Sequence, residues 1–132
     1  MCLVIKKSKH PRGEAKTAKR NIVCYKVLKC NDDMFFTPVL WVSVSHYILS
    51  NEDFVADRFV DKMDDLVFEN EVHYGIHSYR NIFITLFRLA RMKRVSKDYF
   101  IYKCIIPKGS RYWIGHKFEY ASDRIRFKKK LI

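Results

Sequence analysis

The stretch YFIYKCIIPKGSRYWIGHKFEYASDRIRF, residues 99–127, holds most of the strand and turn signal of this chain. Residues 99–106 are mainly β-branched or aromatic, and the run is too short for a surface helix, so it predicts a strand buried on at least one face. Pro107 ends this run, and Gly109 and Gly115 supply turns on either side of a second apolar segment. The stretch therefore predicts a hairpin or a set of neighbouring strands.

Further strands are predicted upstream of this stretch. Residues 22–28, IVCYKVL, alternate well enough for a strand, and the turn residues 31–33 favour a hairpin with a partner strand within 35–49. Shorter strands are expected at 1–5 and 66–74. The expected fold class is α+β, with mainly an antiparallel sheet of about five to seven short strands.

Two helices complete the expected fold. The main helix spans about 79–94, with Ser78 as its N-cap and cations near its C-terminal end. A shorter helix is expected at about 52–63, because Ser50 and Asp53 resemble a capping box and apolar residues then recur at helical spacing. The core face of the main helix is expected to consist of Ile82, Phe83, Leu86, Phe87, Leu89 and Ala90.

Length and composition favour one domain over residues 1–132. Apolar residues make up 48% of the chain and aromatic residues 15%, which favours a packed core over disorder. The segment SKHPRGEAKTAKR, about 8–20, has few apolar residues and is expected to be a flexible basic arm. The N-terminus lacks an apolar stretch long enough for a signal peptide or a membrane span, so we expect a cytoplasmic protein with no membrane partner.

Familiar catalytic and metal-binding patterns are missing from the sequence. His73 and His77 lie four residues apart but bring no acidic third ligand, and Ser78 lacks the surroundings of a nucleophile elbow. We therefore expect no catalytic residue, no metal and no cofactor. The cysteines show no CxxC spacing and are expected to be buried reduced thiols. They are Cys2, Cys24, Cys30 and Cys104.

The net charge of +12 is distributed unevenly along the chain. Residues 1–30 hold nine Lys or Arg against one acid, residues 31–85 hold three against ten, and residues 86–132 hold fourteen against three. If the two basic segments meet in space, they form a patch suited to phosphates or to an acidic protein partner. The alternative is a solvated surface whose charge only aids solubility.

Three motifs resemble a known family. They are VCYKVL at 23–28, YGIHSY at 74–79, and CIIPKGSRYWIG followed by EYASDRI within 104–125. They look like those of a family of small uncharacterised bacterial and phage proteins that share a C-terminal "CIIPKGSRYY-G … YAS" signature. The resemblance covers most of the chain, but it implies no particular activity because that family has no assigned function.

The order of elements is also similar to the layout of ADP-ribosyltransferase folds: a strand, a Gly-x-His-Ser turn, a helix, and a strand ending in IPKG. That similarity implies Lys26 where the nicotinamide dinucleotide is gripped, residues 77–79 at the Ser-Thr-Ser strand, and Arg124 near the catalytic Glu position. Arginine cannot stabilise an oxocarbenium-like centre as a carboxylate does. The similarity therefore implies a divergent or inactive transferase, unless Glu119 or Asp123 substitutes.

The leading functional prediction is a non-enzymatic basic protein that binds RNA or a ribonucleoprotein complex. One concrete form is a phage or mobile-element inhibitor of a host defence system, anti-CRISPR-like in its action. A protein–protein adaptor is a further alternative, and the oligomeric state stays open. Tyr112 and Trp113 are predicted to stack on bases. The cations predicted to bind nucleic acid or an acidic partner are Lys16, Lys19, Arg20, Arg88, Arg91, Lys93, Arg94, Lys97, Lys108, Arg111, Lys117, Arg124, Arg126, Lys128, Lys129 and Lys130.

Overall fold

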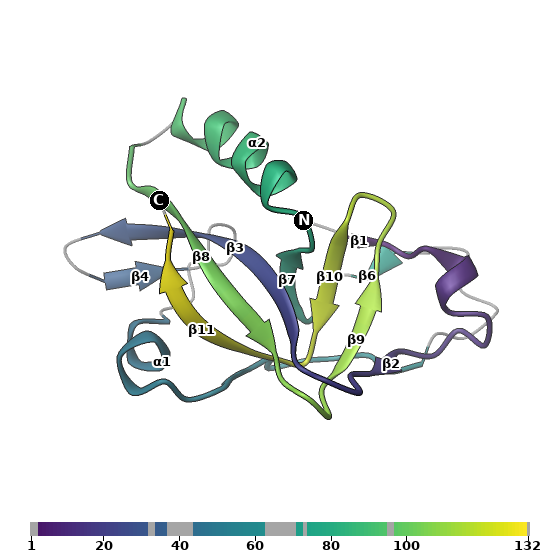
Figure 1. Ribbon diagram of the computed structural model, residues 1–132. Coiled ribbons are helices and arrows are strands. Elements are labelled where there is room, and N and C mark those ends of the chain that lie inside the picture. Colours follow the sequence, from purple (N-terminus) through teal and green to yellow (C-terminus); the bar gives the residue numbers. More distant parts are fainter. Residues whose placement is uncertain are drawn as a thin grey trace.

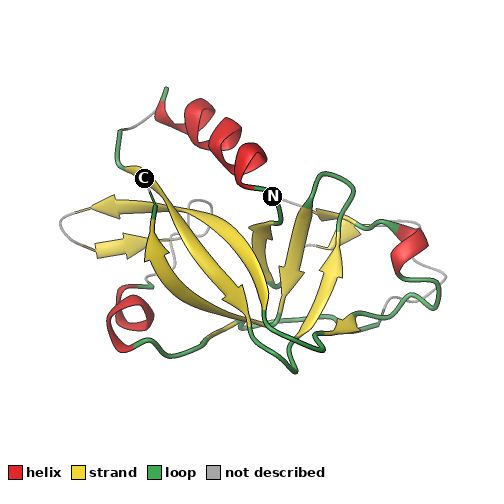
Figure 2. Ribbon diagram, viewed as in Figure 1, coloured by secondary structure: helices red, strands yellow, loops and turns green. Residues whose placement is uncertain are grey.

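The computed structural model describes residues 3–31, 34–36, 44–62, 71–72, 74–94 and 97–131. Figures 1 and 2 show a curved antiparallel sheet with one long helix lying across it, so the predicted α+β class is confirmed. The helical elements are the 3-10 turn η1 (Lys7–Lys9), α1 (Ser45–Ser50) and α2 (Ile82–Lys93). The strands are β1 (Leu3–Val4), β2 (Lys16–Thr17), β3 (Ile22–Asn31), β4 (Met34–Phe36), β5 (Phe54–Val55), β6 (Glu71–Val72), β7 (Ile76–Tyr79), β8 (Tyr99–Ile106), β9 (Arg111–Ile114), β10 (Glu119–Ser122) and β11 (Arg124–Lys130).

The main sheet has nine strands in the order β2-β9-β10-β7-β3-β8-β11-β5, with β4 paired to the end of β3. Strands β1 and β6 form a separate small pair. The stretch quoted above supplies β8, β9, β10 and β11, and these strands lie on both sides of β3 and β7. The two stretches with the strongest strand signal, 22–28 and 99–106, pair directly with each other at the centre.

The pairing of β3 with β8 runs from Ile22 opposite Ile106 to Lys29 opposite Tyr99. Because side chains alternate along a strand, the two strands present one set of residues to each face of the sheet. The larger core, on one face, includes Cys24, Leu28, Tyr102, Cys104 and Ile106. On the other face Val27 and Ile101 form a cluster with Leu89 of α2. Burial on both faces explains why residues 99–106 read as an almost continuous apolar run.

Helix α2 begins at Ile82, three residues later than the start of the predicted helix at 79. Ser78 lies within β7, and Asn81 is the N-cap, because its side-chain oxygen accepts a hydrogen bond of 2.8 Å from the Phe83 backbone N–H. The buried residues of α2 are Thr85 and Leu89. The predicted core face is therefore wrong for Phe83 and Phe87, which are 74% and 62% exposed, and for Ala90, which is also exposed.

The helix expected at 52–63 is wrong over its described residues. The shorter helix, α1, lies earlier and ends at Asn51, which has the left-handed φ of 58°. Phe54 and Val55 instead form β5 on the edge of β11, and the Phe54 ring contacts Phe127. Strand pairing buries Phe54 in the larger core, which an isolated acidic helix would not achieve.

The segment expected to be a flexible arm, about 8–20, packs on the sheet in this structure. His10, Ala15 and Ala18 are buried, and the Ala18 backbone N–H donates to the Ser110 carbonyl at 2.8 Å. His10 Nε2 accepts a hydrogen bond of 2.9 Å from the Ile114 N–H, while Nδ1 lies 3.0 Å from the Glu14 carbonyl. Burial lowers the pKa of His10, which favours this neutral ring. Two small residues, Ala15 and Ala18, and the neutral His10 thus allow a basic segment to pack against the sheet.

Several sequence predictions lie partly outside the described residues. The partner strand expected within 35–49 is confirmed at β4, which pairs with β3, but is wrong at 45–49, which form the helix α1. The strands expected at 66–74 are described only at β6 and Tyr74. Cys2 is also outside. Cys24 and Cys104 are buried free thiols, as predicted, whereas the free thiol Cys30 is only partly buried. Among the described residues, no helix is both long and apolar enough to cross a membrane.

Two glycines with positive φ allow a matched test of how tightly the turns pack. A Cβ at Gly75, with φ of 101°, would lie 3.2 Å from both the Phe59 ring and the Ser122 carbonyl, whereas a Cβ at Gly109, with φ of 90°, would meet only an Arg124 nitrogen at 3.8 Å. We expect Gly109→Ala to lower the free energy of unfolding by about 1 kcal/mol, from backbone strain alone. Gly75→Ala should lower it by about 1–3 kcal/mol more, from overpacking. Equal losses in urea unfolding would contradict the packing at Gly75.

Candidate functional site

Nine cations from three segments lie at one end of the sheet, which we call the basic end. The C-terminal turn of α2 leads directly into the start of β8, where Tyr99 pairs with Lys29 of β3 and Tyr102 pairs with Lys130 of β11. Figure 1 shows the C-terminal end of the chain beside this start of β8. The nine residues are Lys29, Arg91, Lys93, Arg94, Lys97, Lys103, Lys128, Lys129 and Lys130.

The basic end is exposed, and the described residues that form it include few acids; Asp32 and Asp33, which follow β3 in the sequence, lie outside the described residues. Seven of its members were predicted from the sequence, and all seven are exposed; Lys29 and Lys103, which were not predicted, are partly buried. Asp98 is the one acidic residue within 29–31, 91–105 and 126–131. The strand pairing was needed to find Lys29 and Lys103, since both lie inside strands that read as core.

One feature of the basic end is unfavourable for the stability of the fold. Lys129 lies directly opposite Lys103 in the pairing of β8 with β11, next to an irregularity in the register after Phe127. Like charges at directly opposed positions destabilise a sheet. The placement of these two lysines therefore costs stability in the absence of an anion.

Aromatic rings lie among these cations. Lys130 Nζ is 3.9 Å from the centroid of the Phe100 ring, and Lys29 Nζ is 5.6 Å from the centroid of the Tyr99 ring. Both rings are partly exposed. Cation–π attraction holds the ammonium groups close to the rings and so combines positive charge with a π surface.

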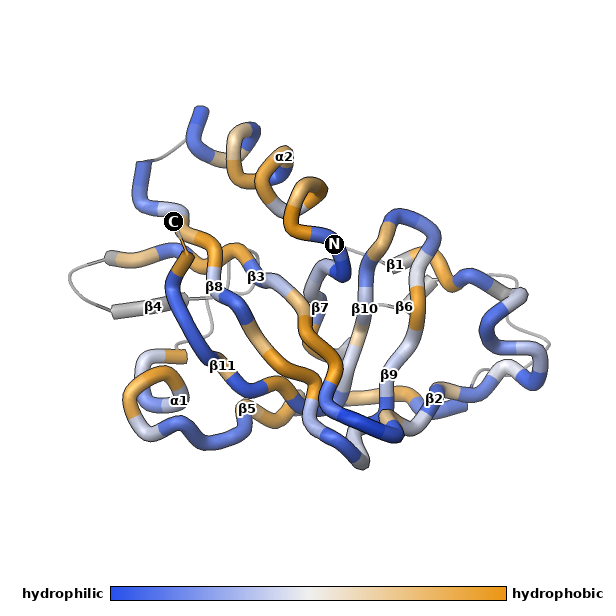
Figure 3. Tube along the Cα trace, in the orientation of Figure 1, coloured by the Kyte–Doolittle hydropathy of each residue, from blue (hydrophilic) through white to orange (hydrophobic). Residues whose placement is uncertain are grey.

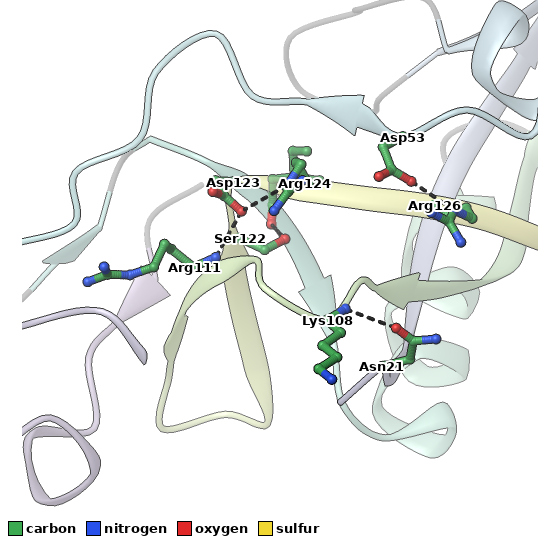
Figure 4. A network of polar contacts seen from close by, with 9 residues as sticks. Asn21, Asp53, Lys108, Arg111, Ser122, Asp123, Arg124 and Arg126 are labelled. Carbon is green, nitrogen blue, oxygen red and sulfur yellow. Dashed lines mark hydrogen bonds and ion pairs between the residues drawn. The ribbon is translucent and has the colours of Figure 1, made fainter. Parts of the chain in front are cut away.

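Three predicted arginines are engaged within the chain (Figure 4). Asp123 accepts a hydrogen bond of 3.0 Å from the Arg111 backbone N–H and lies 4.0 Å from the Arg124 guanidinium. A second carboxylate, that of Asp53, lies 2.8 Å from Arg126 Nε. These arginines hold β9, β11 and the β5 edge together. Much of the charge in the stretch 99–127 is therefore structural.

The Arg111 guanidinium also donates to the Ala15 carbonyl at 3.0 Å, which ties the N-terminal segment to β9. Nearby, Lys108 lies in a turn, and its backbone N–H donates to the Asn21 side chain at 2.9 Å. Lys19 and Arg20 are exposed close to this turn, because the Ala18 carbonyl accepts from the Gly109 N–H. Lys19, Arg20 and Lys108 thus lie at the opposite end of β8 from the basic end.

The prediction that Trp113 stacks on bases is wrong in this structure. Its ring is fully buried with Ile5, Ala15 and Ala121, and its indole N–H donates to the Val60 carbonyl at 2.7 Å. A buried ring has no face free for a base. Tyr112 is partly buried and lies 5.8 Å from the Tyr120 ring, and Lys16 on β2 is also partly buried. Neither residue is close to the basic end in the strand order.

A second polar cluster, which we call the Glu119 site, contains Glu119, Tyr79, Tyr25 and Arg88. Glu119 pairs with Tyr79 across β10 and β7, and Tyr79 pairs with Tyr25 of β3. This is the one register pair described between β3 and β7, so the two halves of the sheet diverge here. Arg88 on α2 and Lys117 in the β9–β10 turn are the predicted cations that act on this site.

Burial raises the pKa of Glu119, and Arg88 and Lys117 oppose that shift. Burial also raises the pKa of Tyr79, again against the effect of Arg88. A half-buried carboxylate beside a buried phenol and a guanidinium is an arrangement that can bind a polar ligand or exchange a proton. From the sequence, Glu119 was predicted only as a substitute carboxylate, because its place beside Tyr79 depends on strand pairing.

Lys26 is a buried cation that the ADP-ribosyltransferase resemblance placed against a dinucleotide. Its Nζ donates to the His77 carbonyl at 2.6 Å, within a core that contains Cys24 and Cys104. Burial lowers the pKa of Lys26 to about 8 and raises the pKa of Cys24 to about 12. A buried lysine in this setting cannot grip a ligand, and a protonated thiol is a poor nucleophile.

Comparisons with known proteins and the search for metal clusters add no candidate. No family model, curated protein or solved structure matches the chain. Within the part of the chain that the structure describes, no three His, Cys, Asp or Glu residues lie close enough to hold a metal ion. The two resemblances therefore stay predictions, and function has to be inferred from the basic end and the Glu119 site.

Buried Lys26 predicts a specific dependence of stability on pH. Its folded pKa of about 8 lies below the model value of 10.5, so the unfolded chain binds more protons between these values and the free energy of unfolding rises with pH there. We expect the free energy of unfolding of the wild type, minus that of Lys26→Met, to increase by about 3 kcal/mol from pH 8 to 10.5. Denaturant unfolding at several pH values measures this. Parallel pH profiles for the two proteins would show that Lys26 is not buried as described.

Proposed function

We propose that this protein is a non-enzymatic binder of RNA or of a ribonucleoprotein complex, and that the basic end is its binding surface. The observation that carries the proposal is the meeting of α2, β3 and β11 at one exposed end that holds nine cations. Phosphate groups are the natural partners of such a surface, because each contact releases counterions from the nucleic acid. The opposed pair Lys103 and Lys129 supports this proposal, since a bound phosphate removes their repulsion.

RNA or another single strand is favoured over duplex DNA. Tyr99 and Phe100 lie partly exposed among the cations, and aromatic rings bind unpaired bases by stacking. Within the described residues, the last turn of α2 and the ends of β3 and β11 form the basic end, so its cations are not arrayed along one helix for insertion into a major groove. These features suit a flexible strand whose backbone follows the cations.

One biological form of this activity is an inhibitor of a host defence nucleoprotein, encoded by a phage or mobile element and anti-CRISPR-like. A chain of 132 residues with a net charge of +12 is small enough to bind RNA exposed within a larger particle. Binding of this kind would compete with the guide or target RNA of the particle. We place this activity in the cytoplasm, where such particles act.

Replacing the three C-terminal lysines tests the basic end. Lys128→Ala/Lys129→Ala/Lys130→Ala should weaken binding to a labelled single-stranded oligouridine and reduce the salt dependence of the affinity, by about 0.7 in the slope of log K against log[salt] for each lost contact. Fluorescence anisotropy over a salt series measures both quantities.

The matched control is Lys6→Ala/Lys9→Ala/Lys62→Ala, which removes the same charge from exposed lysines near the other half of the sheet. This control should retain most of the affinity and nearly the full salt slope. Equal losses in the two triple variants would mean that net charge alone drives binding and that the basic end has no special role.

A second candidate function is ADP-ribosyl transfer at the Glu119 site. The observation in its favour is that the Glu119 carboxylate lies in register with Tyr79 and Tyr25 across β10, β7 and β3. Arg124 is not part of this row. A carboxylate can stabilise an oxocarbenium-like centre, which Arg124 cannot. Arg88 beside Glu119 adds a group able to bind a phosphate.

Incubation with a labelled nicotinamide dinucleotide separates the two candidates. The binding proposal predicts that the wild type neither transfers nor hydrolyses it. If the second candidate is right, the wild type is active and Glu119→Gln is inactive, because the amide removes the charge while keeping the shape. Since Glu119 lies outside the basic end, Glu119→Gln should bind oligouridine as the wild type does. Activity that survives in Glu119→Gln would exclude this carboxylate as the reacting group.

A further inference from the structure

The outer face of α2 carries two exposed aromatic rings. Phe83 is 74% exposed and Phe87 is 62% exposed, one helical turn apart, which corresponds to about 6 Å along the helix axis. Arg91 follows at the same interval, and its guanidinium carbon is 6.0 Å from the centroid of the Phe87 ring. The stripe Phe83–Phe87–Arg91 therefore runs along the helix toward the basic end.

Core packing does not account for this stripe. The inward face of α2 is formed by Thr85 and Leu89, with Leu86 and Met92 packed against the β3–β8 cluster. Figure 3 shows hydrophobic residues along most of α2 and hydrophilic residues at its C-terminal end. Two large apolar rings on the solvent side of one helix are a feature typical of binding surfaces.

Charge indicates what kind of partner covers the stripe. The residues of α2 and its flanks that are charged are all cationic: Arg80, Arg88, Arg91, Lys93 and Arg94. The stripe is also continuous with the basic end, because Arg91 belongs to both. A partner that covers it must therefore bring negative charge and flat apolar groups at short, regular intervals. A single strand of nucleic acid has both.

We propose that Phe83 and Phe87 form a stacking platform for unpaired bases of a single-stranded nucleic acid whose phosphates contact the basic end. The proposal rests on the proposed function and adds to it a second contact region and a class of ligand. Stacking on an aromatic ring tolerates every base, so the platform confers preference for single strands without preference for sequence. Duplexes keep their bases paired and gain nothing from these rings.

The test compares Phe83→Ala/Phe87→Ala with the wild type. Both side chains are exposed and alanine favours helix, so the variant should fold. We expect its affinity for single-stranded oligouridine to fall about tenfold or more, with an unchanged salt slope and an unchanged affinity for an RNA duplex of equal length. The matched control is Leu49→Ala, which removes a side chain that is 87% exposed on α1 and should change neither affinity.

A spectroscopic readout reports stacking directly. Phe87→Trp keeps a ring at the platform and should bind oligouridine at least as tightly as the wild type. Its fluorescence, after subtraction of the wild-type signal, should be quenched when oligouridine is added, because the base covers the indole. The signal of the two native tryptophans, Trp41 and the fully buried Trp113, is removed by the subtraction.

The outcomes separate the two claims. If the wild type shows no salt-dependent binding to oligouridine, the proposed function fails and the platform with it. If the wild type binds but the double alanine variant binds equally well, or loses duplex and single-strand affinity alike, the platform alone is refuted. If the wild type self-associates in light scattering and the double variant becomes monomeric with its RNA affinity intact, the stripe is a protein contact, which also overturns the inference.

Discussion

The pairing of β3 with β8 is the interaction on which the rest of the structure depends. Both strands are buried on both faces, with the larger core on one side and α2 on the other. Because the two strands are antiparallel, the end of β3 and the start of β8 coincide. That single fact brings the C-terminal end of α2 and, through β11, the terminal lysines to one place. The basic end is therefore a consequence of the central strand pair.

The positive charge of this protein serves two different purposes. Around Asp123 and Asp53, two arginine side chains lie close to a carboxylate: Arg124 is 4.0 Å from Asp123 and Arg126 is 2.8 Å from Asp53. Arg111 contacts Asp123 through its backbone N–H. At the basic end, Asp98 is the one acid within the described ranges 29–31, 91–94, 97–105 and 126–131, and two lysines face each other. Net charge counts both kinds equally. Cations of the second kind are the ones suited to the phosphate-bearing partner that we propose, so the location of acids decides which cations are candidates for binding.

The sequence predicts those features of the fold that depend on local pattern. The strands at 22–28 and 99–106 and the main helix follow from alternation, helical spacing and turn residues, and the structure contains them. The α+β class follows in turn. The seven exposed members of the basic end were also found from sequence, since runs of Lys and Arg at element ends are visible without a structure.

The remaining features depend on contacts between distant residues. β5 forms because Phe54 and Val55 pair with the edge of β11, which is about 70 residues away in the sequence. The residues around Phe54 carry no local pattern that predicts this pairing. Trp113 is buried because His10 and Ala15 fold over it, although their segment reads as a basic arm. Helical spacing alone does not decide which face of α2 packs on the sheet, because Phe83 and Leu86 lie close together around the circumference of an apolar helix. Glu119 becomes a candidate only when β10 lies beside β7.

Amide hydrogen exchange with and without single-stranded RNA tests the central claim most directly, because it maps the bound surface on the unmodified chain. The account predicts slower exchange in 87–101 and 126–131 when oligouridine is bound. Exchange in the turn at 107–110 and in 14–20 should stay unchanged, although cations are present there. Protection confined to 14–20 and 107–110, or no protection at RNA concentrations that saturate binding, would contradict the assignment of the basic end.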